Sequence, residues 1–346
     1  MAHNQDTTDR KIDHIRLCLN EDVAFKNKSN GFDKYSFEHD ASTEVDIHSI
    51  DLETDFFGKT IDLPFMISSM TGGANGSFKI NEDLAVVANK LNIPIGVGSQ
   101  RQALENKFHH DSYKIIKEVS GKVPIIANIG AAQVAKGLAK KEIDLILNII
   151  EADALIIHLN PLQELIQKDG NIYFKGLADE IENLVKEIEI PIVIKEVGSG
   201  ISKSVANKFL NIGVKGIDVA GAGGTSWAGV EYLRNGKKET PYWDWGLPTS
   251  YCLRKVRELK VEFDFMLIGS GGVNSGTEIA KAIALGADVT ASARIVLKTL
   301  AETGVDKTVL LIENWFKTLK EIMYLTGCQT LKEFKNVNMI KSGDIY

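Results

Sequence analysis

The stretch PIVIKEVGSGISKSVANKFLNIGVKGIDVAG, residues 191–221, contains two short apolar runs with an amphipathic segment between them. The runs at 191–197 and 216–221 are largely apolar without strict alternation, which is typical of strands buried on both faces of a parallel sheet. Val205, Phe209 and Ile212 between them fall on one face of a helix. The stretch therefore predicts one strand–helix–strand unit of an α/β sheet.

The same alternation continues in both directions from this unit. Helical periodicity recurs at 84–91 and 181–188. Eight strands, most of them followed by a helix, predict a (β/α)8 TIM barrel, with a doubly wound open sheet as the alternative. The count of eight, and polar residues at every strand end, favour the barrel. The other six apolar runs are PFMIS (64–68), PIGVG (94–98), VPIIANI (123–129), ALIIHL (154–159), FMLIGSGG (265–272) and ADVTASA (287–293).

Segments at both ends of the chain lie outside the eight apolar runs that are predicted to form the barrel. We expect a single TIM-barrel domain over residues 1–346 with its core at 61–300. An N-terminal cap segment at 1–60 should cover one end of the barrel. A C-terminal helical segment at 301–346 should begin with an amphipathic helix over 306–325.

Composition narrows the class of protein. A net charge of −6 argues against binding to nucleic acid or an acidic membrane, because both need a basic surface. The N-terminus lacks an apolar signal core, and no apolar run approaches the ~20 residues of a membrane span. Cys18, Cys252 and Cys328 have no metal-ligand spacing and are interpreted as reduced thiols. We therefore expect a cytoplasmic protein with no nucleic-acid or membrane partner.

Polar residues and glycines follow every predicted strand. In a TIM barrel these positions meet on the C-terminal face, where active sites lie. Any one of them can simply turn the chain or cap a helix. All eight together predict a site that surrounds a ligand. The positions are Ser68–Gly73, Gly98–Arg101, Asn128, His158–Glu164, Lys195–Glu196, Ala222–Trp227, Gly271–Asn274 and Ser292–Arg294.

The last two strand ends predict a phosphate site. Gly271 and Gly272 allow close backbone approach, and Asn274 or Ser275 can cap a helix that points at an anion. Ser292 and Ala293 begin the next helix, which completes the two-loop phosphate site of such barrels. Lys195 is either a rim lysine that extends to solvent or a fixed cation. A flavin gives that cation a role, since positive charge near N1 stabilises the reduced ring.

FMN is therefore the favoured cofactor. Met70, Thr71 and Gly72 would lie against its ring, and Asn128 could bond the pyrimidine edge.

Three cations and one carboxylate suit a phosphorylated substrate. The Arg101 guanidinium matches phosphate geometry, whereas Arg10-Lys11 is also compatible with ordinary solvated surface. Glu164 is either a solvated carboxylate at a helix start or a ligand for Mg²⁺, which typically uses one or two carboxylates plus substrate phosphates. His158 and Asn160, two residues apart, share a face at their strand end.

The motifs closely resemble one family, the FMN-dependent type 2 isopentenyl diphosphate isomerases. Five motifs carry the resemblance, in order and each after a predicted strand. The tails at 1–9 and 330–346 match poorly. Some members have Ser-Thr-His where this chain has Ser-Gln-Arg at 99–101. The five motifs are Met70-Thr71-Gly72-Gly73, Gly98-Ser99-Gln100-Arg101, His158-Leu159-Asn160-Pro161-Leu162-Gln163-Glu164, Lys195-Glu196-Val197-Gly198 and Gly223-Gly224-Thr225-Ser226-Trp227.

The resemblance implies a role for each matching position. FMN contacts would be Ser69, Met70, Thr71, Gly72, Ser99, Asn128, Lys195, Thr225, Gly271, Gly272, Val273, Asn274, Ser292 and Ala293. Substrate contacts would be Arg10, Lys11, Ser99, Gln100, Arg101 and Gln163. Glu164 would bind Mg²⁺, and Gln163, His158 and Asn160 would be catalytic.

The implied reaction converts isopentenyl diphosphate to dimethylallyl diphosphate, in isoprenoid precursor synthesis. It is a 1,3-allylic proton shift in which reduced FMN serves as acid and base and NADPH is the reductant. The enzyme is expected to be a homo-oligomer. One alternative is an FMN-dependent α-hydroxyacid oxidoreductase with His158 as base and Arg101 as carboxylate clamp, which leaves Gln163 and Glu164 without a role. The other is a non-catalytic phosphate-binding barrel or assembly scaffold.

Overall fold

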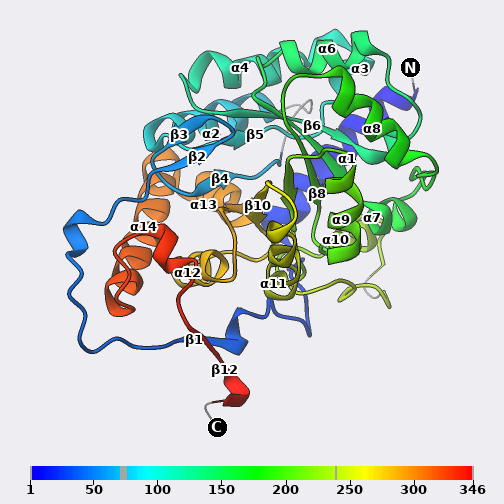
Figure 1. The fold of residues 1–346 in the computed structure, drawn as a ribbon. Helices are drawn as coiled ribbons and strands as arrows, with labels where there is room; N and C mark the ends of the chain where they lie inside the picture. The colour runs from blue at the N-terminus through cyan, green and yellow to red at the C-terminus, as the bar shows by residue number, and fades with distance from the viewer. Residues whose placement is uncertain (1, 71–75, 238–239, 345–346) are drawn as a thin grey trace.

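Eight parallel strands form a closed barrel with helices around it (Figure 1). The computed structural model describes residues 2–70, 76–237 and 240–344. The strands neighbour one another in the order β10-β11-β4-β5-β6-β7-β8-β9, so β11 pairs with β4 and closes the ring. Closure confirms the predicted (β/α)8 TIM barrel and excludes the open sheet.

Each barrel strand lies at a predicted apolar run. Most are shorter than the run, because its glycine-rich or polar end turns into a loop at the rim. The strands are β4 (Phe65–Ile67), β5 (Ile95–Gly96), β6 (Ile125–Gly130), β7 (Ala154–Leu159), β8 (Ile192–Glu196), β9 (Gly216–Asp218), β10 (Met266–Gly269) and β11 (Val289–Ser292).

Most of the helices between the strands bury an apolar face against the barrel. Those that follow the strands are α2 (Ser77–Leu91), α3 (Arg101–Glu105), α4 (Asp111–Val119), α5 (Ala131–Val134), α6 (Lys140–Asn148), α7 (Pro161–Ile166), α8 (Leu177–Glu187), α9 (Lys203–Asn211), α10 (Trp227–Arg234), α11 (Thr249–Arg257), α12 (Gly276–Ala284) and α13 (Arg294–Thr303).

The C-terminal segment adds two α-helices and a strand to this ring. The predicted helix at 306–325 is α14 (Val305–Leu325), which packs on α2, α12 and α13. The short α15 (Leu331–Phe334) leads to β12 (Met339–Lys341), which pairs antiparallel with β1 (Tyr35–Phe37) near the C-terminus (Figure 1). Among the described residues, no helix has the length and apolar character that crossing a membrane requires.

The N-terminal segment covers both ends of the barrel, not the one end that we expected. Helix α1 (Ala2–Asn20) lies on the C-terminal face, where it contacts α3, α10 and α13. The hairpin of β2 (Thr54–Phe56) and β3 (Lys59–Ile61) covers the opposite end. There Phe56 and Ile61 pack into the cluster of side chains that fills the barrel interior. The alternation of apolar runs and helical segments in the sequence does not show that residues 1–60 contain two elements that cap opposite ends of the barrel.

Candidate active site

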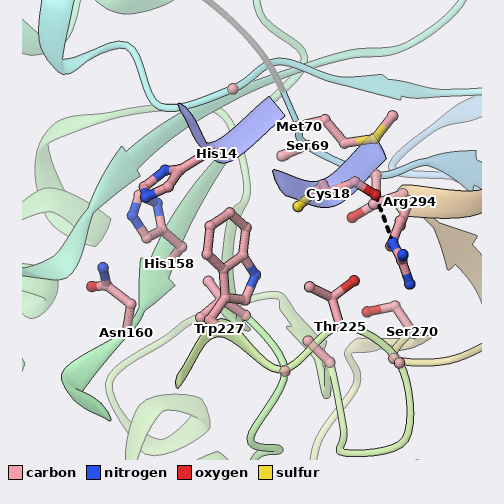
Figure 2. A pocket seen from close by; sticks show the side chains of 18 of the residues that line it. His14, Cys18, Ser69, Met70, His158, Asn160, Thr225, Trp227, Ser270 and Arg294 are labelled. Carbon is pink, nitrogen blue, oxygen red and sulfur yellow. Dashed lines mark hydrogen bonds between the residues drawn. The ribbon is translucent and has the colours of Figure 1, made fainter. Parts of the chain in front are cut away.

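A cavity of about 530 Å³ lies at the C-terminal face, between the barrel rim and α1. Residues from all eight strand ends line it, together with five residues of α1. Figure 2 shows His158, Asn160 and Trp227 on one side of it, and Ser270 and Arg294 on the other. Its size is typical of pockets for cofactors and small ligands.

Most of the predicted site residues meet in this cavity. Thr71 and Gly72 lie outside the described residues, and the side chains of Gln100 and Val273 are not in the lining. The predicted residues that line it are Arg10, Lys11, Ser69, Met70, Ser99, Arg101, Asn128, His158, Asn160, Gln163, Glu164, Lys195, Thr225, Gly271, Gly272, Asn274, Ser292 and Ala293.

Two predicted contact residues have side chains that point away from the cavity. The Gln100 side chain is fully buried: it accepts from Asn128 N at 3.0 Å and donates to Ile146 O at 2.7 Å. The side chain therefore joins two parts of the barrel wall and does not face the cavity. The Val273 side chain is buried in the hydrophobic core, so only its backbone can face a ligand. Position after a strand does not determine which way a side chain points.

The two loops expected to bind phosphate come close to neighbouring backbone. Gly271 and Gly272 have φ values of 102° and 71°, which only glycine adopts readily. A Cβ at Gly224 would lie 2.6 Å from Gly272 N, so a side chain there is excluded as well. Ser275, not Asn274, caps α12 by accepting from Glu278 N. Both α12 and α13 begin beside the cavity, where their amide ends favour an anion.

Two buried polar atoms in the lining lack partners. Ser69 Oγ and Asn160 Oδ1 have no hydrogen-bond partner among the described residues. An unpaired buried polar atom is costly, so a polar ligand at these positions would stabilise the site. Together with the glycine loops and the Lys195 cation, these atoms fit a ligand with polar ring edges and a phosphate, as FMN has.

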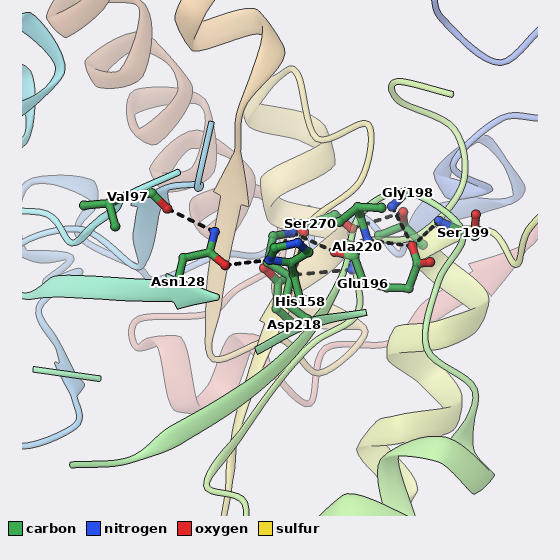
Figure 3. Close-up of polar contacts among 12 residues, drawn as sticks. Val97, Asn128, His158, Glu196, Gly198, Ser199, Asp218, Ala220 and Ser270 are labelled. Carbon is green, nitrogen blue, oxygen red and sulfur yellow. Dashed lines mark hydrogen bonds and ion pairs between the residues drawn. The ribbon is translucent and has the colours of Figure 1, made fainter. Parts of the chain in front are cut away.

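The His158 ring is neutral, and its tautomer follows from its neighbours. Asn128 Nδ2 donates to Val97 O at 3.0 Å, so Asn128 Oδ1 is an acceptor. It lies 2.8 Å from His158 Nδ1, which must therefore carry the hydrogen (Figure 3). Burial, followed by the charges of Lys195 and Lys11, lowers the pKa of His158 to about 4. Near neutral pH, Nε2 is thus a hydrogen-bond acceptor and not an acid.

Three cations gather at one end of the cavity. Lys11 Nζ donates to Ser99 O at 2.9 Å, and Arg101 Nε pairs with Glu105 Oε1 at 2.7 Å. Burial, and then the neighbouring Arg10, lowers the pKa of Lys11 to about 7. Burial and the Arg101 charge lower the pKa of Arg10 as well. Such mutual repulsion is relieved when a multiply charged anion binds between the cations.

Glu164 extends into the lining from the first turn of α7. Its Oε1 accepts from Asn160 Nδ2 at 3.1 Å, and its Oε2 accepts from Asn171 N at 2.6 Å. In the described parts of the chain no group of three or more His, Cys, Asp or Glu residues could hold a metal ion. A cation here would therefore need oxygens from a ligand in addition to this carboxylate.

A buried carboxylate under the lining was missed at the sequence level. Glu231 of α10 is fully buried and bonds His14 Nε2 at 2.8 Å, Arg234 Nε at 2.9 Å and Gln163 Nε2 at 3.1 Å. It connects α1, α7 and α10. No local motif pairs residues 217 positions apart. One feature of the sequence pointed to His14 as a site residue. His14 follows Arg10 at i+4 and therefore lies on the same helix face.

Known proteins with this fold include several flavin enzymes. A flavocytochrome b2 variant with sulfite bound matches with a TM-score of 0.70 at 20% identity, over 95% of this chain and 83% of that one. A putative lactate oxidase of Pediococcus acidilactici matches with a TM-score of 0.69 at 15% identity, over 98% and 93%. At these identities the likeness shows the fold alone.

Other proteins are much more similar to this chain in sequence. Isopentenyl-diphosphate delta-isomerase of Pelodictyon phaeoclathratiforme is 44% identical, with 97% of this chain and 98% of the relative covered. The Nostoc enzyme of that name is 41% identical, with 95% of each covered. A family model described as FMN-dependent dehydrogenase matches residues 3–112 and 162–341. The chain therefore belongs to the FMN-dependent dehydrogenase family and, within it, to the isopentenyl-diphosphate delta-isomerases.

Proposed function

We propose that this protein converts isopentenyl diphosphate to dimethylallyl diphosphate by a 1,3-proton shift, with reduced FMN and Mg²⁺. The observation that carries the proposal is that two groups of lining residues meet in one cavity, and we assign a part of the cavity to each group. One part has the glycine loops, the helix starts and Lys195, and the other has Arg10, Lys11 and Arg101. The relatives named above support the same activity.

The first part would hold FMN. The phosphate would bind at the starts of α12 and α13, beside Gly271, Gly272 and Ser292. Lys195 and Ser69 Oγ would meet the polar edges of the ring. When bound in its reduced form, FMN supplies an acid and base at N5 and an electron-rich face that stabilises positive charge.

The second part would bind the diphosphate. Charge-assisted hydrogen bonds from Arg10, Arg101 and Lys11 suit its oxygens. Because burial holds the pKa of Lys11 near 7, a bound polyanion would favour its protonated form. Glu164 would supply one ligand to Mg²⁺, and the diphosphate oxygens would supply others. This binding energy would position the hydrocarbon end, which offers few contacts of its own.

The side chains between the two parts would orient the reacting carbons. The neutral His158 ring can accept a hydrogen bond at Nε2 and has no proton to give there, so we assign it an orienting role and not protonation of the alkene. Asn160 Nδ2 donates to Gln163 Oε1 at 3.2 Å, which holds these two amides together. The Trp227 ring lines the same region and lies edge-on to His14, with centroids 5.1 Å apart. A π face there would stabilise a developing cation.

The proposal also covers the cellular compartment, the reductant and the assembly of the enzyme. The cysteines Cys18, Cys252 and Cys328 are all free, which is consistent with a reducing cytoplasm. We propose NADPH as the reductant that keeps FMN active, and a homo-oligomer as the assembled form.

The test is a set of omissions on purified protein. Isopentenyl diphosphate should be converted only when FMN, a reductant and Mg²⁺ are all present. The oxidised holoenzyme should be inactive until dithionite or NADPH is added under anaerobic conditions. Full turnover by oxidised enzyme, or by FMN-free protein, would contradict the proposal.

A further inference from the structure

A buried carboxylate lies directly behind Lys195. Asp218 of β9 is in register with Lys195 of β8, and its Oδ2 is 3.2 Å from Lys195 Nζ. Asp218 is fully buried and does not line the cavity, whereas Lys195 does. The ammonium therefore lies between the carboxylate and the space proposed for the flavin.

The other contacts of Asp218 leave the ammonium as its main counter-charge. Oδ1 accepts from Ser270 Oγ at 2.5 Å and from Ala220 N at 3.3 Å (Figure 3). Oδ2 accepts no hydrogen bond of good geometry from the described residues, so the Lys195 ammonium is its close partner. Two of the three donors on the ammonium thus face protein, since Lys195 Nζ also donates to Glu196 O at 3.0 Å.

The nearby titratable groups do not replace this carboxylate. Glu196 turns its Oε2 toward three loop amides, at Val197, Gly198 and Ser199. Burial raises the pKa of Glu196 to about 7 in spite of these bonds. His158, on the strand at the other side of Lys195, is neutral near pH 7. Among the described residues, Asp218 is therefore the carboxylate that pairs directly with the Lys195 ammonium.

Stability alone is a weak explanation for this arrangement. A buried ion pair is weak evidence for stabilisation, because desolvation of the two charges offsets their attraction. If Lys195 served only to supply a full positive charge, a carboxylate behind it would work against that role. A neutral side chain on β9 would leave a stronger cation.

We propose that Asp218 is a positioning residue whose counter-charge moderates Lys195 and keeps the midpoint potential of the bound flavin low. A low potential corresponds to an electron-rich reduced ring, which suits reversible proton transfer without net oxidation. The identity of the flavin rests on the proposed function, but the potential is measured without turnover.

The experiment measures the midpoint potential of FMN bound to the whole protein against a reference dye. Asp218→Asn keeps the shape and removes the charge, so it should favour reduction at least tenfold. For a two-electron couple this is a rise of about 30 mV. Ser270→Ala removes the hydrogen bond to Asp218, leaves the carboxylate less neutralised, and should lower the potential. With Asp218→Asn, kcat should fall while KM for the diphosphate stays unchanged.

Asp288→Asn is the matched control. Asp288 also pairs with lysines, Lys260 and Lys335, but it precedes β11 at the end of the barrel away from the cavity. Its loss should leave the potential and the activity unchanged.

An unchanged or lowered potential in Asp218→Asn would overturn the proposal. If Asp218→Asn does not retain FMN, the midpoint potential of Ser270→Ala tests the proposal instead. A potential of Ser270→Ala at or above that of the unaltered protein would then overturn the proposal. Failure of the proposed function has a different result, because flavin-loaded, reduced, unaltered protein would not convert isopentenyl diphosphate whatever the potentials are.

Discussion

Replacing Glu231 by Gln should release α1 from the barrel rim. Burial alone would raise the pKa of Glu231, but bonds and charges from His14, Arg234 and Gln163 lower it to about 2, from its ordinary value of 4.5. At about 1.4 kcal/mol per tenfold change in proton affinity, the ionised form is favoured in the fold by about 3 kcal/mol. This agrees with the roughly 3–5 kcal/mol lost when one partner of a buried ion pair is removed.

The pH dependence of this loss has a definite sign. Because the pKa of Glu231 is depressed in the folded protein, its contribution is complete above pH 4.5 and falls as the pH drops toward 2. Urea unfolding at pH 7 should therefore show Glu231→Gln about 3 kcal/mol less stable. The difference should shrink below pH 4. The KM for isopentenyl diphosphate should rise, since α1 carries Arg10 and Lys11.

Glu258→Gln is the control for this experiment. Glu258 has two lysine partners, Lys203 and Lys255, but is exposed, and such pairs contribute little. A loss of less than about 1 kcal/mol in Glu231→Gln would refute the reasoning, on the scale set by the buried pair. So would an equal loss at pH 7 and pH 3.5.

Three further substitutions test individual roles. Lys195→Ala should weaken FMN retention in equilibrium dialysis, and unchanged retention would make it a simple rim residue. Glu164→Gln should raise the Mg²⁺ concentration needed for half-maximal rate, while wild-type turnover that survives full chelation would reject the metal role. Arg101→Ala should raise the KM for isopentenyl diphosphate about tenfold or more, because a charge-assisted bond contributes roughly 1.5–3 kcal/mol. Loss of FMN with unchanged KM would reverse the Arg101 assignment.

The barrel could be predicted because its signal is local. Each strand buried on both faces leaves an apolar run, and each strand end leaves a polar or glycine-rich segment. The C-terminal rim then follows from topology, which is why residues as far apart as Ser69 and Ser292 were expected in one cavity. Fold and lining both come from these repeated local patterns.

The rest of the site depends on pairings between distant residues. The direction of the Gln100 side chain depends on Ile146 and Asn128, which belong to other elements. The bond between His14 and Glu231 joins α1 to α10 and exists only after the barrel has closed. The sequence around His14 or Glu231 does not indicate this bond. An aspartate in an apolar strand run, as at Asp218, could be noticed, but its lysine partner could not.

The proposed reaction is a proton shift without net oxidation, and isotope transfer tests it most directly. Photoreduced holoenzyme is incubated anaerobically with isopentenyl diphosphate in D₂O, with no further reductant. We expect many turnovers per flavin, deuterium in the new methyl group of dimethylallyl diphosphate, and flavin that is still reduced at the end. A single turnover that leaves the flavin oxidised would show hydride transfer and contradict the account.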